Sequence, residues 1–309
     1  DGELLISPIC TPAGGKPLGG ISILQISDHQ SLKGRVPFMQ DLVVRIGEVI
    51  HQARQEVRKR EGLDLNQELA NAGRIQAGIL PEKPPPLSGW EIAARLEPAL
   101  QTSGDFYDFI PLANNNLGIL IADVSDKGMG AALFMALSST LVRTYAVQYA
   151  TLPSFAMGLV NERILSDTRD GMFVTTFYGV LEPDTGRLRY VNAGHNRPYL
   201  ISKRKGKSVD QLGSTGMALG VDESATWGQK LVRFVPGDVL VLYTDGVTEA
   251  QDRGGRFYGE TRLLDVIRPM RARPAEEILE AVLADLERFT GGAPQADDIA
   301  LIVVCRKGE

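Results

Sequence analysis

Cysteine, histidine and aromatic side chains are scarce in this sequence. Its 309 residues include 2 Cys and 3 His, and aromatic residues make up 6% of the chain. Cys10 and Cys305 stand at opposite ends, without the close spacing of zinc ligands. We therefore expect two free thiols in a reducing compartment and no zinc site.

Long hydrophobic runs and basic segments are also missing. No stretch approaches the roughly 18 consecutive apolar residues of a membrane span. The given sequence also does not start with the charged residues and apolar run that are typical of a signal peptide. The formal net charge of −5 argues against nucleic acid as the main partner, because phosphate backbones would be repelled. With 43% hydrophobic residues the chain can still bury a sizeable core. We expect a soluble, cytoplasmic protein with neither a membrane nor a nucleic acid as partner.

The first segment, residues 1–37, holds two short apolar runs, Leu4 to Ile9 and Gly20 to Ile26. Proline and glycine residues separate the runs, which predicts two strands with a hairpin-like connection. Two strands alone are marginally stable in water. Because the sequence also begins without Met and in mid-strand, we expect it to be a piece of a longer protein, with further strands upstream.

The second segment, residues 38–80, has the spacing of a long helix. Apolar side chains recur on one narrow stripe, and charged side chains cover the other faces. Such a helix buries little by itself, which favours pairing with a second copy as a coiled coil and hence a homodimer; the alternative is a helix packed on its own domain. Gly62 interrupts the register, and the prolines after Leu80 end the helix. The stripe comprises Leu42, Ile46, Val49, Ile50, Ala53, Val57, Leu65, Leu69, Ala72 and Ile75.

The third segment, residues 88–309, contains runs of strands and pairs of helices. This order predicts an α+β fold, in which antiparallel sheets pack on each other and helices flank them. The predicted strands are 90–97, 104–112, 116–123, 172–182, 187–193, 197–203, 229–234, 238–244 and 299–305, and the predicted helices are 128–148, 153–167, 260–269 and 274–289.

Four aspartates occupy turn-rich positions at the ends of apolar runs: Asp105, Asp123, Asp245 and Asp297. If the runs are buried strands, these carboxylates emerge at a sheet edge and repel one another. Hard divalent cations with oxygen ligands, such as Mg²⁺ or Mn²⁺, would resolve that repulsion. The set therefore predicts a metal-dependent enzyme. Asp298 directly follows Asp297, but alternation points the two to different sides, so only one is expected to be a ligand.

Three of the four aspartates have a simpler interpretation when each is taken alone. Asp123 and Val124 enter a glycine-rich turn before an apolar helix, where a capping role is equally expected. Asp245 precedes a glycine, and Asp-Gly after a strand is more often only a turn. Asp105 and Asp108 could belong to a solvated strand edge. The set of four is more informative than any member.

Residues 90–305 resemble the SpoIIE/RsbU branch of the PPM (PP2C-like) metal-dependent serine/threonine phosphatases. The segment from Asn71 to Pro81 is similar to the helix end that precedes this domain in the family, and residues 1–30 are similar to the last strands of a GAF sensor domain. The motifs that carry the main resemblance run in family order: Ser-Gly-Asp105-Phe-Tyr-Asp, Ala-Asp123-Val-Ser, Ala-Ala-Leu-Phe-Met, Phe-Val-Thr-Thr-Phe-Tyr-Gly, Asn192-Ala-Gly-His195-Asn, Leu-Tyr-Thr-Asp245-Gly-Val-Thr-Glu249 and Asp297-Asp298-Ile.

The resemblance implies an α-β-β-α sandwich, with two antiparallel sheets flanked by helix pairs, and a site for two Mn²⁺ or Mg²⁺ ions. In such a site Asp123 would bridge both ions and the Val124 carbonyl would assist one of them. Asp245 and Asp297 would complete the shell of one ion and Asp105 would serve the other, so Asp123 and Asp245 are the implied catalytic residues. Hydroxide would attack phosphorus directly. The implied substrate is a phosphorylated STAS-type anti-sigma factor antagonist.

Two positions depart from the family pattern. Ser103 and Asp126 stand where glycine is usual, and Asp126 adds negative charge beside the site. These departures leave open a catalytically degenerate scaffold, which binds metal and a partner without turnover. His195 is a candidate proton donor, with a structural role as the alternative.

Overall fold

The computed structural model describes residues 3–9, 19–25, 36–168, 171–202 and 209–308. Its contacts divide the chain into two compact units, Asp1–Glu68 and Leu69–Glu309. Helix α1 (Val36–Ala77) contributes to both units. The second unit therefore includes the last turns of α1 together with residues 88–309.

The first unit contains the two predicted strands and most of the long helix. β1 (Glu3–Ile9) and β2 (Gly19–Gln25) pair antiparallel, with Ile6 opposite Ser22. The segment that connects them lies outside the described residues. α1 continues through Gly62 without a break, since one glycine within a helix costs only about 1 kcal/mol.

The second unit is built on two antiparallel sheets, each with five strands among the described residues. The apolar residues of these strands are buried on both faces of each sheet, because helices cover the outer faces and the sheets cover each other. Sheet I has the order β10 (Lys230–Arg233), β7 (Arg187–Ala193), β6 (Val174–Glu182), β5 (Leu117–Val124) and β4 (Phe106–Pro111). Sheet II has the order β3 (Trp90–Glu97), β12 (Ile299–Arg306), β11 (Val239–Tyr243), β8 (Tyr199–Ile201) and β9 (Val209–Gln211).

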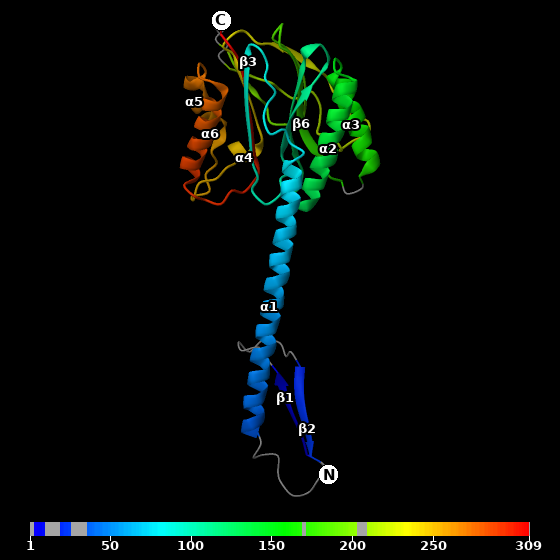
Figure 1. Ribbon diagram of the computed structural model, residues 1–309, viewed down its shortest axis with the longest axis vertical. Coiled ribbons are helices and arrows are strands. Elements are labelled where there is room, and N and C mark those ends of the chain that lie inside the picture. The colour runs from blue at the N-terminus through cyan, green and yellow to red at the C-terminus, as the bar shows by residue number, and fades with distance from the viewer. Residues whose placement is uncertain (1–2, 10–18, 26–35, 169–170, 203–208, 309) are drawn as a thin grey trace. The chain divides into compact units, whose positions relative to one another are not determined.

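A pair of helices covers the outer face of each sheet (Figure 1). α2 (Met129–Gln148) and α3 (Pro153–Asp167) pack on sheet I. α5 (Gly259–Met270) and α6 (Ala275–Thr290) pack on sheet II. This arrangement confirms the predicted α-β-β-α sandwich.

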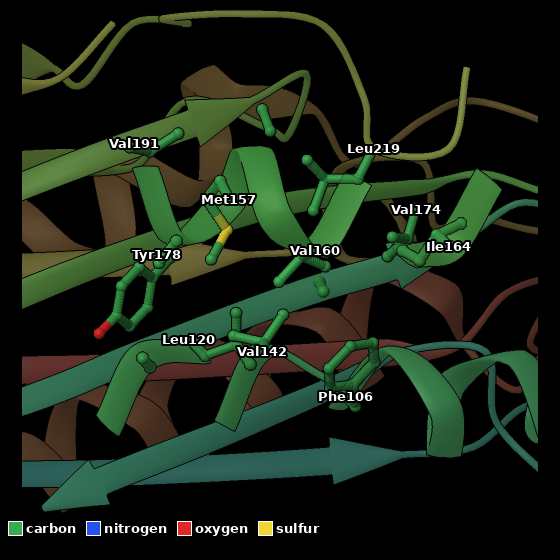
Figure 2. Packing of buried hydrophobic residues seen from close by; sticks show 14 of the residues in the cluster. Phe106, Leu120, Val142, Met157, Val160, Ile164, Val174, Tyr178, Val191 and Leu219 are labelled. Atoms are coloured by element: carbon green, nitrogen blue, oxygen red, sulfur yellow. The ribbon is translucent and has the colours of Figure 1, made fainter. Parts of the chain in front are cut away.

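Three apolar layers hold the sandwich together. Figure 2 shows the layer between sheet I and its helices, where Leu120 of β5 lies near Val142 of α2 and Val160 of α3. The middle layer joins the inner faces of the two sheets, with Phe177 from sheet I and Ile302 from sheet II among its fully buried members. Burial of a large apolar side chain stabilises a fold by about 1.5 to 3 kcal/mol, so these layers fix the positions of the strand ends that carry the site.

Helix α2 is long and apolar enough, by length and composition, to cross a membrane, and it is the one such helix among the described residues. Its buried side chains, including Phe134, Met135 and Val142, belong to the core under sheet I. A core helix passes the same test of length and composition, so this feature is weak evidence of a membrane span.

The predicted strands and helices of the third segment are present, and all of their ends lie within two residues of the observed ones. Three short elements were not predicted: the 3₁₀ turn Ala113–Asn115, strand β9 and helix α4 (Asp245–Thr248). Elements of three or four residues span about one helical turn, so they are too short for a periodic pattern to be recognised.

Candidate active site

Asp105 and Asp123 lie at the same end of sheet I. Phe106, the first residue of β4, pairs with Ala122 of β5, and the two strands are antiparallel. Asp105 precedes Phe106 and Asp123 follows Ala122, so the two residues lie side by side at this end of the sheet. Asp123 in turn pairs with Thr175 of β6.

Asp245 and Asp297 lie together at one end of sheet II. Tyr243, the last residue of β11, pairs with Leu301 near the start of β12. Asp245 comes just after Tyr243, and Asp297 just before β12 begins. Asp245 opens the short helix α4 and is not part of a simple turn.

The two pairs lie near each other, because Asp298 accepts hydrogen bonds from Ser103 and Gly104, just before Asp105, and Lys127, shortly after Asp123, pairs with Asp297. Burial raises the pKa of Asp105 well above its ordinary 3.8, and the negative charge of Asp123 raises it further. Burial, followed by the charge of Asp245, raises the pKa of Asp123 to about 7. Burial, followed by the charge of Asp297, raises the pKa of Asp245. The structure thus brings the four aspartates into one acidic cluster.

Little positive charge balances this cluster. The buried Oδ2 of Asp105 has no hydrogen-bond partner among the described residues. Lys127, in the turn before α2, places its Nζ 2.9 Å from Asp297 Oδ2 and donates to the Ala296 carbonyl at 2.6 Å. Within the described part of the chain, no three acidic, histidine or cysteine side chains lie close enough to hold one metal ion as they stand. Sequence reasoning missed Lys127, because a lysine in a turn carries no signal of its own.

Asp298 holds the segment before Asp105 in place through hydrogen bonds. Its Oδ1 accepts a hydrogen bond from the Ala99 N–H at 2.7 Å, and its Oδ2 accepts from the Gly104 N–H at 2.7 Å and from Ser103 Oγ at 2.8 Å. Buried carboxylates with three donors are strongly held. The serine at position 103 therefore has a function that glycine lacks, namely a hydroxyl donor to Asp298.

The end of α1 packs on the same segment. Gln76 is buried, its Nε2 donates to the Ser103 carbonyl at 2.6 Å, and its Oε1 accepts from the Ser103 N–H at 2.9 Å. Gly73 approaches the Gln101 carbonyl so closely that a Cβ would lie 1.9 Å from the oxygen. Sequence reasoning missed Gln76, since a glutamine in a helix belongs to no motif.

Backbone conformation explains two further positions. Gly246 packs on the Asp298 carbonyl, where a Cβ would lie only 1.9 Å from the oxygen, so the Asp-Gly of this motif is required by a close approach. Asp126 is exposed and has a φ of 75°, the left-handed conformation that glycine adopts without strain. The turn thus keeps a glycine-like backbone with an aspartate side chain. The Val124 carbonyl lies beside Gly104, in the segment that carries Asp105.

The comparison with known families is decisive for identification. A family model described as Stage II sporulation protein E (SpoIIE) matches residues 113–307. This chain belongs to the SpoIIE family. The SpoIIE match includes Asp123, Asp245 and Asp297, whereas Asp105 precedes it.

Relatives and solved structures agree with membership of the SpoIIE family. The chain is 34% identical over 267 residues to Protein IcfG from Synechocystis sp., a match that covers 77% of this chain and 41% of IcfG. It is 29% identical over 244 residues to Phosphoserine phosphatase RsbU from Bacillus subtilis, which covers 79% of this chain and 71% of RsbU. The SiaA-PP2C domain of Pseudomonas aeruginosa has a TM-score of 0.70 at 22% identity, covering 79% of this chain and 97% of that domain. The fold is therefore PP2C-like, and this chain spans less than half the length of IcfG.

His195 of this SpoIIE-family chain is buried beside the site. Its Nδ1 lies 3.0 Å from Thr175 Oγ1, and its backbone N–H donates to Asn192 Oδ1 at 2.9 Å. Burial lowers the pKa of His195 to about 4, so the ring is neutral at neutral pH. A buried and neutral imidazole fits the structural alternative better than the role of a proton donor.

Asp108 does not lie on a solvated edge. β4 is the edge strand of sheet I, but Asp108 is buried and binds Arg143 of α2 through two hydrogen bonds, Nε to Oδ2 at 2.9 Å and Nη2 to Oδ1 at 2.8 Å. Burial raises the pKa of Asp108, and the Arg143 charge opposes that rise. This pair joins α2 to the strand that follows Asp105.

No thiol lies in the site within the described residues. Cys305 is buried in the core of sheet II, and burial raises the pKa of its thiol to about 12. Such a thiol is almost entirely protonated at neutral pH and is a poor nucleophile. Cys10 lies outside the described residues.

Proposed function

We propose that this chain is a metal-dependent protein phosphatase that hydrolyses phosphoserine or phosphothreonine. The observation that carries the proposal is the acidic cluster, in which Asp105, Asp123, Asp245 and Asp297 meet at the facing ends of two sheets in a SpoIIE-family domain. Carboxylates with raised pKa values mark sites where a missing positive charge is needed.

The residues present fit divalent metal ions. Asp105 has a buried oxygen without a hydrogen-bond partner among the described residues, and the neighbouring aspartates raise each other's pKa, so a cation would be strongly favoured there. The donors are all oxygen, which suits Mn²⁺ or Mg²⁺. We propose that Asp105, Asp123, Asp245, Asp297 and the Val124 carbonyl would hold two such ions.

When bound, such ions supply Lewis-acid activation of water and of the phosphoryl oxygens. The chain's own residues hold the carboxylates in place for that chemistry. Asp298 and Ser103 fix the backbone before Asp105, and Gly246 lets α4 lie against the start of β12. Lys127 pairs with Asp297 and limits the repulsion within the cluster.

The substrate that we propose is a phosphorylated STAS-type anti-sigma factor antagonist in the cytoplasm. The support is the family resemblance and the likeness to RsbU, which is named a phosphoserine phosphatase. We also propose that residues 1–37 are the end of a GAF-like sensor domain and that the stripe of α1 holds a homodimer. Val49, a member of this stripe, is an exposed apolar side chain that a second helix would cover.

A scaffold without turnover is the second candidate, and Asp126 is the observation that favours it. Its side chain adds a negative charge at a position where the family has glycine. The backbone at Asp126 nevertheless keeps the conformation that the glycine would adopt. Ser103 is likewise accommodated by its hydrogen bond to Asp298. Both departures are thus compatible with an intact site, and we favour the enzyme.

Two assays test the proposal. Purified protein should release p-nitrophenol from p-nitrophenyl phosphate when Mn²⁺ is present and stop when it is chelated, and Asp245→Asn should remove this activity. Phosphorylated STAS proteins from the same genome should then be dephosphorylated under the same conditions. Metal binding without turnover of either substrate would favour the scaffold.

A further inference from the structure

A groove of about 650 Å³ opens beside the acidic cluster. It lies between α4, α6 and the loop of residues 291–297, and we call it the α6 groove. Asp297, a proposed metal ligand, lines this groove, and so does Gly246, which follows the proposed ligand Asp245. A protein segment whose phosphorylated residue reaches the cluster would therefore extend into the α6 groove. Its volume lies in the range of sites that bind small ligands or short segments.

The surface of the α6 groove is partly apolar. Leu283 of α6 and Pro294 of the loop line it, together with Phe257, whose side chain is 59% exposed. An exposed aromatic ring in a concave surface can bind an apolar chain, and its face also attracts a cation. These residues provide contact area without selecting a charge by themselves.

The charged residues of the α6 groove are mostly acidic. Five carboxylates and one guanidinium line it. Arg95 is engaged with Glu280 by a hydrogen bond and lies 3.7 Å from Glu276. No cation among the described side chains pairs with Glu97, Glu249 or Glu287, all of which are exposed. The groove therefore presents three carboxylates without an ion-pair partner among the described side chains, together with one exposed aromatic ring.

The rim of the α6 groove is held in place. Gln295 Nε2 donates to the Glu97 carbonyl and to the Asp297 carbonyl, both at 2.8 Å. These bonds join the loop of residues 291–297 to the end of β3. A groove whose rim is fixed before binding loses less entropy when a ligand enters.

We propose that the α6 groove binds the part of the substrate next to its phosphorylated residue and selects an arginine or lysine there. The inference rests on the proposed phosphatase function and adds a rule of substrate choice to it. The long stem of such a side chain matches the apolar floor, and its cation matches Glu97, Glu287 and the Phe257 ring. An acidic side chain at the same place would be repelled.

Two matched phosphoserine peptides test the α6 groove. One carries arginine at the second and third positions on each side of the phosphoserine, and the other carries glutamine at these positions. The readout is the ratio of their kcat/KM values with Mn²⁺, which cancels any general loss of activity. Exposed ion pairs each change an equilibrium by up to about fivefold, so the unmodified protein should prefer the arginine peptide about five- to tenfold. The preference should shrink at high salt.

Variants locate the preference. The double variant Glu97→Gln, Glu287→Gln should reduce the ratio to about twofold or less, and Phe257→Ala should reduce it in part. Glu287→Arg should improve a third peptide, with glutamates at the same positions, relative to the arginine peptide. The control is Glu162→Gln, an exposed carboxylate on α3 outside the groove, which should keep the ratio of the unmodified protein.

The outcomes separate this inference from the proposed function. If the unmodified protein hydrolyses both peptides at equal rates, or if the double variant keeps the full preference, the α6 groove does not select basic side chains and the phosphatase proposal stands. If neither peptide nor p-nitrophenyl phosphate is hydrolysed with Mn²⁺ bound, both the proposed function and this inference fail.

Discussion

Replacing Asp123 by asparagine is expected to stabilise the metal-free protein at pH 8 while abolishing its phosphatase activity. Burial, with the charge of Asp245, raises the pKa of Asp123 from 3.8 to about 7. The folded protein therefore binds this proton more tightly than the unfolded chain does, and stability is lost as the pH rises from about 4 through 7. Asparagine has nearly the same volume and no charge to ionise, so the variant escapes that loss.

The size of the effect follows from the pKa. One pKa unit corresponds to about 1.4 kcal/mol, so the rise from 3.8 to about 7 sets an upper bound of about 4 kcal/mol for the gain at pH 8. Because the neighbouring aspartates share the repulsion, we expect about 2 kcal/mol. The gain should shrink as the pH falls and vanish below pH 4, where the carboxyl group is protonated in both states.

Urea unfolding in the presence of a chelator measures this gain at pH 5 and pH 8. Glu162→Gln on α3 is the matched control and should change the free energy of unfolding by less than about 0.5 kcal/mol at either pH. Added Mn²⁺ should stabilise the unmodified protein more than Asp123→Asn, because the variant has lost a ligand. Turnover of p-nitrophenyl phosphate should fall by several orders of magnitude. An Asp123→Asn protein that is no more stable than the unmodified one at pH 8 would refute the argument from charge repulsion.

Three further predictions concern residues outside the cluster. Gln76→Ala should lower the free energy of unfolding by about 2 to 3 kcal/mol and raise the Mn²⁺ concentration needed for activity, because it leaves two buried backbone groups of Ser103 unpaired. The control Gln67→Ala, at an exposed position of the same helix, should change neither quantity. Equal effects of the two substitutions would count against a role of Gln76 in anchoring Ser103. Treatment with iodoacetamide, or replacement of both Cys10 and Cys305 by Ser, should leave the specific activity unchanged, since the proposed nucleophile is water and the Cys305 pKa is about 12. Inactivation by either change at saturating Mn²⁺ would overturn this mechanism. The double variant Ile46→Asp, Ile50→Asp should convert a dimer to a monomer in analytical ultracentrifugation and change the basal activity. The control double variant Arg58→Gln, Lys59→Gln should change neither property much. If the unmodified chain is a monomer at tens of micromolar and the isoleucine variant has unaltered activity, α1 has no part in the mechanism.

Much of the sandwich could be predicted from the sequence, because its strands and helices are long and regularly patterned. The run from Ile299 to Val304 is buried on both faces and could hardly be anything but an internal strand. The ends of the runs also marked the four aspartates, since polar residues at the ends of buried strands gather at the same edge. Short elements such as α4 carry too few residues for a pattern.

Interactions between segments that are distant in the sequence could not be predicted from it. The alternation of side chains along a strand indicated that Asp297 and Asp298 point to different sides. Only the hydrogen bonds from Ser103 and Gly104 show that Asp298 holds the segment before Asp105 in place. The Asp-Gly at position 245 looked like a turn, because the approach of Gly246 to β12 depends on the sheet pairing. Local propensity contains no information about which backbone a glycine will meet.

The amide of Gln76 also bears on where this domain should be considered to begin. A shortened chain that starts at the proline-rich segment after Leu80 would keep every proposed ligand, yet Ser103 would lose both of its hydrogen bonds to Gln76. A chain restricted to residues 113–307 would lose Asp105 as well. A piece that keeps both hydrogen bonds of Ser103 thus begins within the helix, before Gln76, as does the second compact unit, which starts at Leu69.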